Sequence, residues 1–258
     1  MVLLFPDRPP LQPFDFVRDR PVALYLFEWK TRLPRNRMGA LRPNGPFRHL
    51  RTGSEMMSKG DQTRQRIVAQ AASLFNQRGY EGCSMSELME ATGLEKGGIY
   101  RHFSSKEELA AEAFDYAWRT AIGLRMRDLD SIPNSVDALK LFITNFIERH
   151  PPIPGGCPLL NTAIDADDGN RVLRSRARKA LRDWHKDLSG LAANGIKRKE
   201  IKPGIDPKQV ATAIISSLEG ALMMSRLEGN RSALFAVQSY LETYLDTQVR
   251  AGKSDTAL

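Results

Sequence analysis

The sequence predicts an all-α protein, and three observations lead to that prediction. From Ser58 onward, apolar residues recur at three- and four-residue spacing, which is typical of helices, and no strand-like alternation is present. A serine followed three residues later by an acidic residue precedes several of these segments, which is the pattern of a capping box. Glycine or proline separates them. We expect a bundle of short helices in residues 58–120, a larger helical domain in residues 121–250 and a flexible tail in residues 251–258.

Residues 1–57 differ from the rest of the chain. Eight of the 15 prolines fall in residues 1–46, and no helical or alternating period persists there. Two interpretations remain open. The stretch is a basic, disordered arm that adds nonspecific attraction to phosphate, or it is a non-native extension before a start at Met56 or Met57. We favour the second, because capping and periodicity begin abruptly after these two methionines.

Residues 58–120 contain short helices joined by tight turns, as in a helix-turn-helix module. Capping boxes begin at Ser58, Ser84 and Ser105, and Gly79 and Gly93 are suited to end the helices before the turns. The predicted helix-turn-helix spans residues 84–103, with its third helix at about 95–103.

The third helix of this bundle carries the predicted contact surface. On a helical wheel Ile99 and Phe103 fall together and are expected to face the core. The residues on the opposite side offer a guanidinium, a phenol, an imidazole and a gap without a side chain, and this face suits the DNA major groove. Residues at the starts of the flanking helices are placed to bind phosphate. The predicted DNA-binding residues are Ser84, Lys96, Gly97, Tyr100, Arg101, His102 and Lys106.

Residues 60–120 resemble the N-terminal domain of the tetracycline-repressor (TetR) family of bacterial transcriptional regulators. The matches are the apolar face from Ile67 to Phe75, the segment from Lys96 to Phe103, and the segment from Ser105 to Leu109. Glu95 departs from the family pattern, which often has a small hydroxyl residue as the cap there. The resemblance implies a homodimer that binds double-stranded operator DNA and responds to a small-molecule effector of unknown identity.

The later chain is predicted to be helical at about 135–149, 158–167, 170–193, 207–227 and 231–249. The last two of these helices each carry an apolar stripe. The resemblance implies that these two helices pair with their symmetry mates in a four-helix bundle, and the alternative is that both stripes belong to the core of one chain. The predicted dimer-interface residues are Val210, Ile214, Leu218, Ala221, Leu222, Leu234, Val237, Leu241 and Leu245.

An effector pocket is implied by the resemblance, although apolar residues at helical spacing are more often plain core. Cys157 precedes Pro158 at a predicted helix start, where the helix dipole lowers the pKa of a thiol. A sensor of electrophiles or oxidants and a small buried residue are both open interpretations of this cysteine. The candidate pocket residues are Trp118, Phe142, Phe146, Cys157, Leu160, Ile164, Trp184 and Met223.

Composition limits the possible functions. The net charge is +8, yet residues 61–118 carry nine acidic against six basic residues, so the total charge is no evidence for DNA binding. Two cysteines fit a reducing cytoplasm, and no apolar run reaches the length of a membrane span. Two histidines, His150 and His185, lack metal-ligand spacing with each other, and no phosphate loop or nucleophile motif is present.

We therefore expect a cytoplasmic, ligand-responsive transcriptional repressor that binds a pseudo-palindromic operator as a dimer and is released by a small-molecule or electrophile effector. No metal or cofactor is expected. A structural or nonspecific DNA-binding protein is the main alternative, and a helical enzyme is a remote one.

Overall fold

The computed structural model of the protein describes residues 58–167 and 169–252. The regular elements in those two ranges are helices, and a single isolated bridge joins Ile201 to Arg250. The all-α prediction is confirmed for the part of the chain that is described. The expectation for residues 1–57 falls outside it, as does most of the predicted tail.

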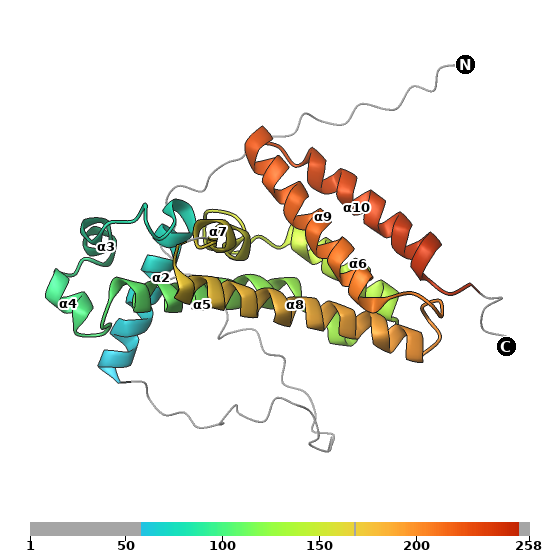
Figure 1. The fold of residues 1–258 in the computed structure, drawn as a ribbon, viewed down its shortest axis with the longest axis horizontal. Helices are drawn as coiled ribbons and strands as arrows, with labels where there is room; N and C mark the ends of the chain where they lie inside the picture. Colours follow the sequence, from blue (N-terminus) through green and yellow to red (C-terminus); the bar gives the residue numbers. More distant parts are fainter. Residues whose placement is uncertain (1–57, 168, 253–258) are drawn as a thin grey trace, which may run out of the picture. The chain divides into compact units, whose positions relative to one another are not determined.

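The N-terminal bundle has the four predicted helices (Figure 1). Side chains of Ser58, Ser84 and Ser105 each accept a hydrogen bond from the backbone three residues on, which confirms them as caps. The third helix is shorter than predicted: it ends at Tyr100, and a hydrogen-bonded turn continues to Phe103. The bounds are α2 (Lys59–Arg78), α3 (Met85–Thr92), α4 (Lys96–Tyr100) and α5 (Lys106–Arg125).

The second group of helices follows the predicted order. One helix runs four residues past its predicted end at residue 193, and the last one changes to a π-helical turn at Leu245. The bounds are η1 (Leu129–Ser131), α6 (Ser135–Glu148), α7 (Pro158–Asp165), α8 (Arg171–Lys197), α9 (Pro207–Glu228), α10 (Ser232–Tyr244) and η2 (Leu245–Val249).

Helix α5 connects two hydrophobic cores. Its first half packs on α2 and contributes Leu109 to a small core with Ile99 and Phe103. Its second half packs along α8 (Figure 1) and contributes Trp118 to a larger core in which Trp184 is fully buried. A shift of α5 would therefore displace side chains in both cores, because close-packed interiors transmit displacement.

Helix α9 lies between α8 and α10 and packs on both. By length and composition alone it is apolar enough to be a candidate membrane span, and it is the one such helix among the described residues. Core helices of globular proteins have the same composition, and the face of α9 that carries Val210, Ile214 and Leu218 is buried in this fold.

Candidate functional site

Local interactions define both ends of α3 and the turn that leads to α4. Ser84 and Glu87 form a reciprocal capping box at the start of α3, in which the Glu87 carboxylate accepts from the Ser84 backbone N–H at 2.8 Å. At the end of α3, Gly93 has φ 62° and ψ 26°, a left-handed conformation that glycine adopts at little cost. Glu95 precedes α4 and makes no side-chain capping bond.

The orientation predicted for α4 is confirmed. Ile99 and Phe103 are 1% and 2% exposed and lie in the small core. Lys96, Gly97, Tyr100 and Arg101 are exposed on the other side, and His102 is half-buried. The helix thus presents two cations and a phenol to solvent, with the Lys96 Nζ 5.9 Å from the centre of the Tyr100 ring.

Gly97 leaves an open gap in this face. A Cβ atom built on Gly97 meets no atom within 4 Å, so packing within the described residues does not require glycine there. Glycine in a helix costs about 1 kcal/mol relative to alanine. A surface that approaches the backbone of α4 closely, as a DNA groove does, would give this glycine a role.

Ser84 and Lys106 both have partners inside the protein: the capping box of Ser84 was predicted, and the contact of Lys106 was not. The Ser84 hydroxyl donates to the Glu87 carboxylate at 2.9 Å. The Lys106 ammonium donates to the Tyr80 carbonyl at 2.6 Å and lies 4.4 Å from the centre of the Tyr80 ring. An ammonium has three N–H donors, so a phosphate contact by Lys106 stays a prediction alongside this structural role.

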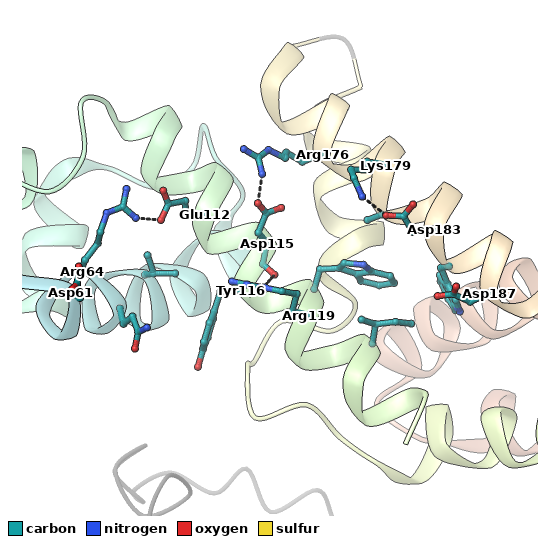
Figure 2. A pocket seen from close by; sticks show the side chains of 16 residues that line it. Asp61, Arg64, Glu112, Asp115, Tyr116, Arg119, Arg176, Lys179, Asp183 and Asp187 are labelled. Carbon is teal, nitrogen blue, oxygen red and sulfur yellow. Dashed lines mark hydrogen bonds and ion pairs between the residues drawn. The ribbon is translucent and has the colours of Figure 1, made fainter. Parts of the chain in front are cut away.

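A cleft of about 1110 Å³ opens between α2, α5 and α8 (Figure 2). Ion pairs link its walls: Arg64 with Glu112 across α2 and α5, and Arg176 with Asp115 across α5 and α8. Burial raises the pKa of Asp115, and the nearby Arg176 opposes this. Of the candidate pocket residues, Trp118 and Trp184 line this cleft.

A buried polar cluster lies behind those two indoles, and we call it the Arg125 cluster: Arg125, Cys157 and Glu219. The three residues come from the end of α5, the cap of α7 and the middle of α9. The Cys157 thiol donates to Glu219 Oε1 at 2.9 Å, and Arg125 Nη1 lies 3.6 Å from the same oxygen.

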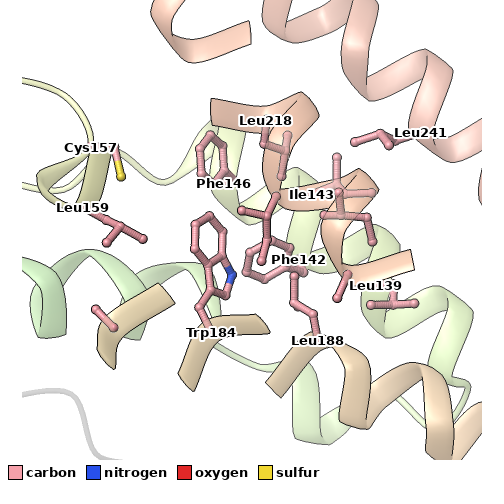
Figure 3. Packing of buried hydrophobic residues seen from close by; sticks show 14 of the residues in the cluster. Leu139, Phe142, Ile143, Phe146, Cys157, Leu159, Trp184, Leu188, Leu218 and Leu241 are labelled. Carbon is pink, nitrogen blue, oxygen red and sulfur yellow. The ribbon is translucent and has the colours of Figure 1, made fainter. Parts of the chain in front are cut away.

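Three aromatic rings enclose the Arg125 guanidinium. Its central carbon lies 4.1 Å from the ring centre of Phe146, 5.5 Å from that of Trp184 and 5.9 Å from that of Trp118. Figure 3 shows Trp184 with Phe142 and Phe146 in the same interior. Cations over aromatic faces are stabilised by the ring quadrupole, more so when they are desolvated. Four of the candidate pocket residues therefore meet around this one cation.

Other predicted pocket residues lie elsewhere. Phe142 is fully buried core, and Leu160 is partly buried against the same core. Ile164 and Met223 are 70% and 48% exposed, so their placement in an enclosed pocket is wrong for this chain. The helical period identified apolar residues, but it did not show which side of α7 or α9 faces inward.

Cys157 caps α7 with Pro158 in the first turn, as predicted. The predicted lowering of its pKa is wrong. Burial raises the pKa of Cys157 to about 12, and the Arg125 charge opposes this without overcoming it. The thiol is 1% exposed and acts as a hydrogen-bond donor.

The loop before α7 and the first turns of α7 form hydrogen bonds with the last turn of α2. Asn161 Nδ2 donates to the Asn76 and Gly155 carbonyls at 2.9 and 2.8 Å, and Asn76 Nδ2 donates to the Pro154 carbonyl at 2.7 Å. Gly155 has φ 111°, and an added Cβ would lie 2.5 Å from the Asn76 oxygen. These contacts connect the end of α2 to the loop that carries Cys157.

The residues predicted for the dimer interface are largely wrong, while the pairing of the last two helices with their symmetry mates stays a prediction. Most of its residues are buried within the chain itself, between α9, α10, α8 and α6, so the alternative of an intramolecular core holds for them. Leu222 and Val237 are half-buried at its edge. The residues of the stripes that are buried in the core are Val210, Ile214, Leu218, Ala221, Leu234, Leu241 and Leu245.

Apolar residues on the other sides of α9 and α10 are exposed instead, and we call them the outer apolar face. On α9 they follow helical spacing and include Gly220, where an added Cβ meets nothing within 4 Å. The large ones are Met223, Met224, Leu227, Phe235 and Tyr240, exposed by 48, 53, 80, 45 and 64%.

Comparison with known proteins agrees with this architecture. Residues 67–113 match a model of the bacterial regulatory proteins of the tetR family, and residues 135–241 match the tetracyclin repressor-like C-terminal domain. The crystal structure of a TetR transcriptional regulator from Chloroflexus aurantiacus is 45% identical, with a TM-score of 0.72, and covers 76% of this chain and 100% of that one. The chain belongs to the TetR family of transcriptional regulators.

Further relatives are transcriptional regulators as well. A TetR-family regulator from Cytophaga hutchinsonii is 34% identical with a TM-score of 0.71, over 76% of this chain and 99% of that one. The HTH-type transcriptional regulator YxaF of Bacillus subtilis is 28% identical over 70% of this chain and 94% of its own length. The transcriptional repressor DhaR of a Mycobacterium species is 27% identical over 66% of this chain and 86% of its own length.

Arg125 and Glu219 were missed by sequence reasoning, although a signal was present. Glu219 is the single charged residue between Gln209 and Arg226, in an otherwise apolar helix. Arg125 follows Ala117 and Ala121 at four-residue spacing, on the buried side of α5. A lone charge on an apolar stripe indicates a buried polar group that needs a partner.

No group of three or more His, Cys, Asp or Glu residues suited to a metal occurs in the described ranges.

Proposed function

We propose that this TetR-family regulator is a repressor that binds a pseudo-palindromic operator as a homodimer and is released by a small-molecule effector. The observation that carries the proposal is the outward face of α4. It combines Lys96 and Arg101 with Tyr100 and an open gap at Gly97. Arginine and lysine bind guanine edges and phosphates, and a gap lets the backbone come close to a base.

Dimer formation is supported by the outer apolar face. One helix-turn-helix contacts too few base pairs to select a site strongly, and a dimer reads two half-sites. Met223, Leu227 and Phe235 are exposed apolar side chains, and contiguous exposed apolar surface commonly marks a protein interface. We assign the dimer contact to this face in place of the buried stripes.

Effector control is supported by the coupling of α5 to both cores. Repression itself is the role printed for the relative DhaR, and we extend it to this chain as part of the proposal. An effector that binds the C-terminal helices would shift the population toward a state whose α4 helices are wrongly spaced. Because Cys157 is buried and its pKa is raised, its thiol is poorly suited to attack an electrophile. This favours an effector that binds reversibly.

The proposal is tested by selecting binding sites from a random duplex library and then measuring affinity at fixed salt. We expect an enriched palindrome that is bound at least about 10³-fold more tightly than a scrambled duplex. Arg101→Ala should lose about 10- to 100-fold on the selected site, while Arg182→Ala, which removes an exposed arginine of α8, should not. Binding with a steep salt dependence and no preferred sequence would support the alternative of a nonspecific DNA-coating protein.

A further inference from the structure

The Arg125 guanidinium is a buried charge with incomplete pairing. It is 3% exposed, and Glu219 is the one carboxylate within 4.0 Å of it among the residues described. That contact is 3.6 Å, longer than the roughly 2.7–3.2 Å of a good N–H···O bond. The hydrogen bond of Arg125 goes to the Cys157 sulfur at 3.7 Å, and sulfur is a weak acceptor. A guanidinium has five N–H donors, so this one retains capacity to bind an anion.

Two further buried polar atoms point to the same need. Trp184 Nε1 and Glu219 Oε2 have no hydrogen-bond partner within the described residues. An indole N–H can only donate, and buried polar groups in native proteins are nearly always satisfied. Burial raises the pKa of Glu219, although Arg125 opposes the rise. An acceptor in this interior would satisfy the Trp184 N–H, and an acceptor beside Arg125 would use the free donors of the guanidinium.

The side chains around Arg125 indicate that the rest of such a ligand is apolar. Phe146, Trp118 and Trp184 surround the guanidinium with apolar surface. Trp118 and Trp184 also line the cleft between α2, α5 and α8, together with Ile122. The same two indoles thus lie beside Arg125 and line the cleft, so the cleft adjoins the surroundings of the cluster.

We propose that Arg125 binds the carboxylate of the effector, and that the effector is an apolar organic acid. A carboxylate matches the planar guanidinium and accepts two parallel N–H bonds. An organic cation would be repelled by Arg125, and a neutral molecule would leave the buried charge unpaired. The inference rests on the proposed function, because it names the chemical class of the effector.

The first test compares acids with their neutral isosteres on the full-length protein. Phenylacetate, 3-phenylpropionate and 4-phenylbutyrate are each titrated against their primary amides by calorimetry and by tryptophan fluorescence. We expect at least one acid to bind about tenfold or more tightly than its amide, since a hydrogen bond to a charged group is lost in the amide. Equal binding of acid and amide, or no binding by any of the three acids, would overturn the inference.

Three variants locate the site. Arg125→Met should abolish the preference for acids, and Arg127→Met should keep it, because Arg127 is exposed two residues beyond the end of α5. Glu219→Gln keeps the side-chain shape and removes the carboxylate that competes for Arg125, so it should bind the acids more tightly. If Arg125→Met does not fold, Glu219→Gln decides alone, and weaker acid binding by it contradicts the proposal.

DNA binding separates failure of this inference from failure of the proposed function. Wild-type protein without any acid should bind its selected duplex, and an acid that binds should release it. Selective DNA binding that no acid affects contradicts the inference and leaves the repressor function standing. Failure to select any duplex contradicts the proposed function itself.

Discussion

Helices α4 and α9 each turn one side to a core and the other to solvent, but their outer sides differ in chemistry. The outer side of α4 carries Lys96 and Arg101 around a glycine gap. The outer side of α9 carries Met223, Met224 and Leu227. A polar face with a gap fits a charged, grooved partner, whereas an apolar face fits a second apolar surface.

The inner sides of the two helices differ as well. Ile99 of α4 lies in a cluster of apolar side chains, while Glu219 of α9 lies beside Arg125 and Cys157. Burying polar groups costs free energy unless they are paired. The difference indicates that the inner side of α4 serves folding, and that the inner side of α9 also serves recognition.

The largest expected effect concerns the outer side of α9. The double substitution Leu227→Glu with Phe235→Glu puts charges into the proposed dimer contact, where each buried, unpaired charge costs several kcal/mol. The dimer dissociation constant should rise by at least about 10⁴-fold, as measured by analytical ultracentrifugation. Leu181→Glu, at a 44% exposed leucine of α8, is the matched control and should leave the mass unchanged. A double variant that stays dimeric would move the interface elsewhere.

The next effect tests whether Cys157, beside the inner side of α9, is inaccessible to reagents from solvent. With its pKa at about 12, Cys157 carries roughly a thousandth of the thiolate of an ordinary cysteine at pH 8. Alkylation of the native protein by iodoacetamide should therefore be about 10³-fold slower than in denaturant, and its rate should still rise with pH above 9. Peptide mapping distinguishes Cys157 from Cys83. Rapid alkylation of native Cys157 that is already independent of pH at 8 would restore the electrophile-sensor hypothesis.

A smaller effect sharpens the role of Lys106 beside α4. If its ammonium binds phosphate, Lys106→Met should weaken binding to all duplexes alike and reduce the slope of log affinity against log salt by about 1. If it serves only the Tyr80 contact, the melting temperature should fall and the salt slope should not change. The salt slope and the melting temperature together show whether Lys106 binds phosphate, stabilises the fold or does both.

The smallest effect contrasts two glycines. Gly97→Ala should stabilise the fold by up to about 1 kcal/mol, because the added methyl group meets nothing, while weakening DNA binding. Gly155→Ala should destabilise it by about 1–3 kcal/mol, because φ there is positive and the methyl group would collide with Asn76. Urea denaturation measures both. A Gly97→Ala protein with unchanged DNA affinity would show that α4 does not approach DNA through that gap.

Local signals made much of the fold predictable. Serine caps, glycine ends and helical periodicity placed the helices within a few residues, because these interactions are formed between neighbours in the chain. The outer side of α4 was predictable for the same reason: Ile99 and Phe103 identify the inner side, and the remaining residues must face outward.

The interface and the Arg125 cluster could not be predicted in the same way. Apolar spacing and the family resemblance led to Val210 and Leu218 as contacts between chains, but the same spacing suits the core in which they are buried. Arg125, Cys157 and Glu219 are far apart in the sequence, and only the packing of α5, α7 and α9 brings them together. A lone charge on an apolar stripe indicates that Arg125 and Glu219 each need a buried partner, but the sequence does not show which residue the partner is.

The proposed function requires the outer side of α4 to read DNA sequence. Fluorescence anisotropy of the selected palindrome and of a scrambled duplex, for wild type and Arg101→Ala at the same salt concentration, tests this directly. We expect strong discrimination by the wild type, and a variant that loses affinity mainly for the selected duplex. Equal affinity of the wild type for both duplexes, or unchanged discrimination in Arg101→Ala together with Lys96→Ala, would contradict it.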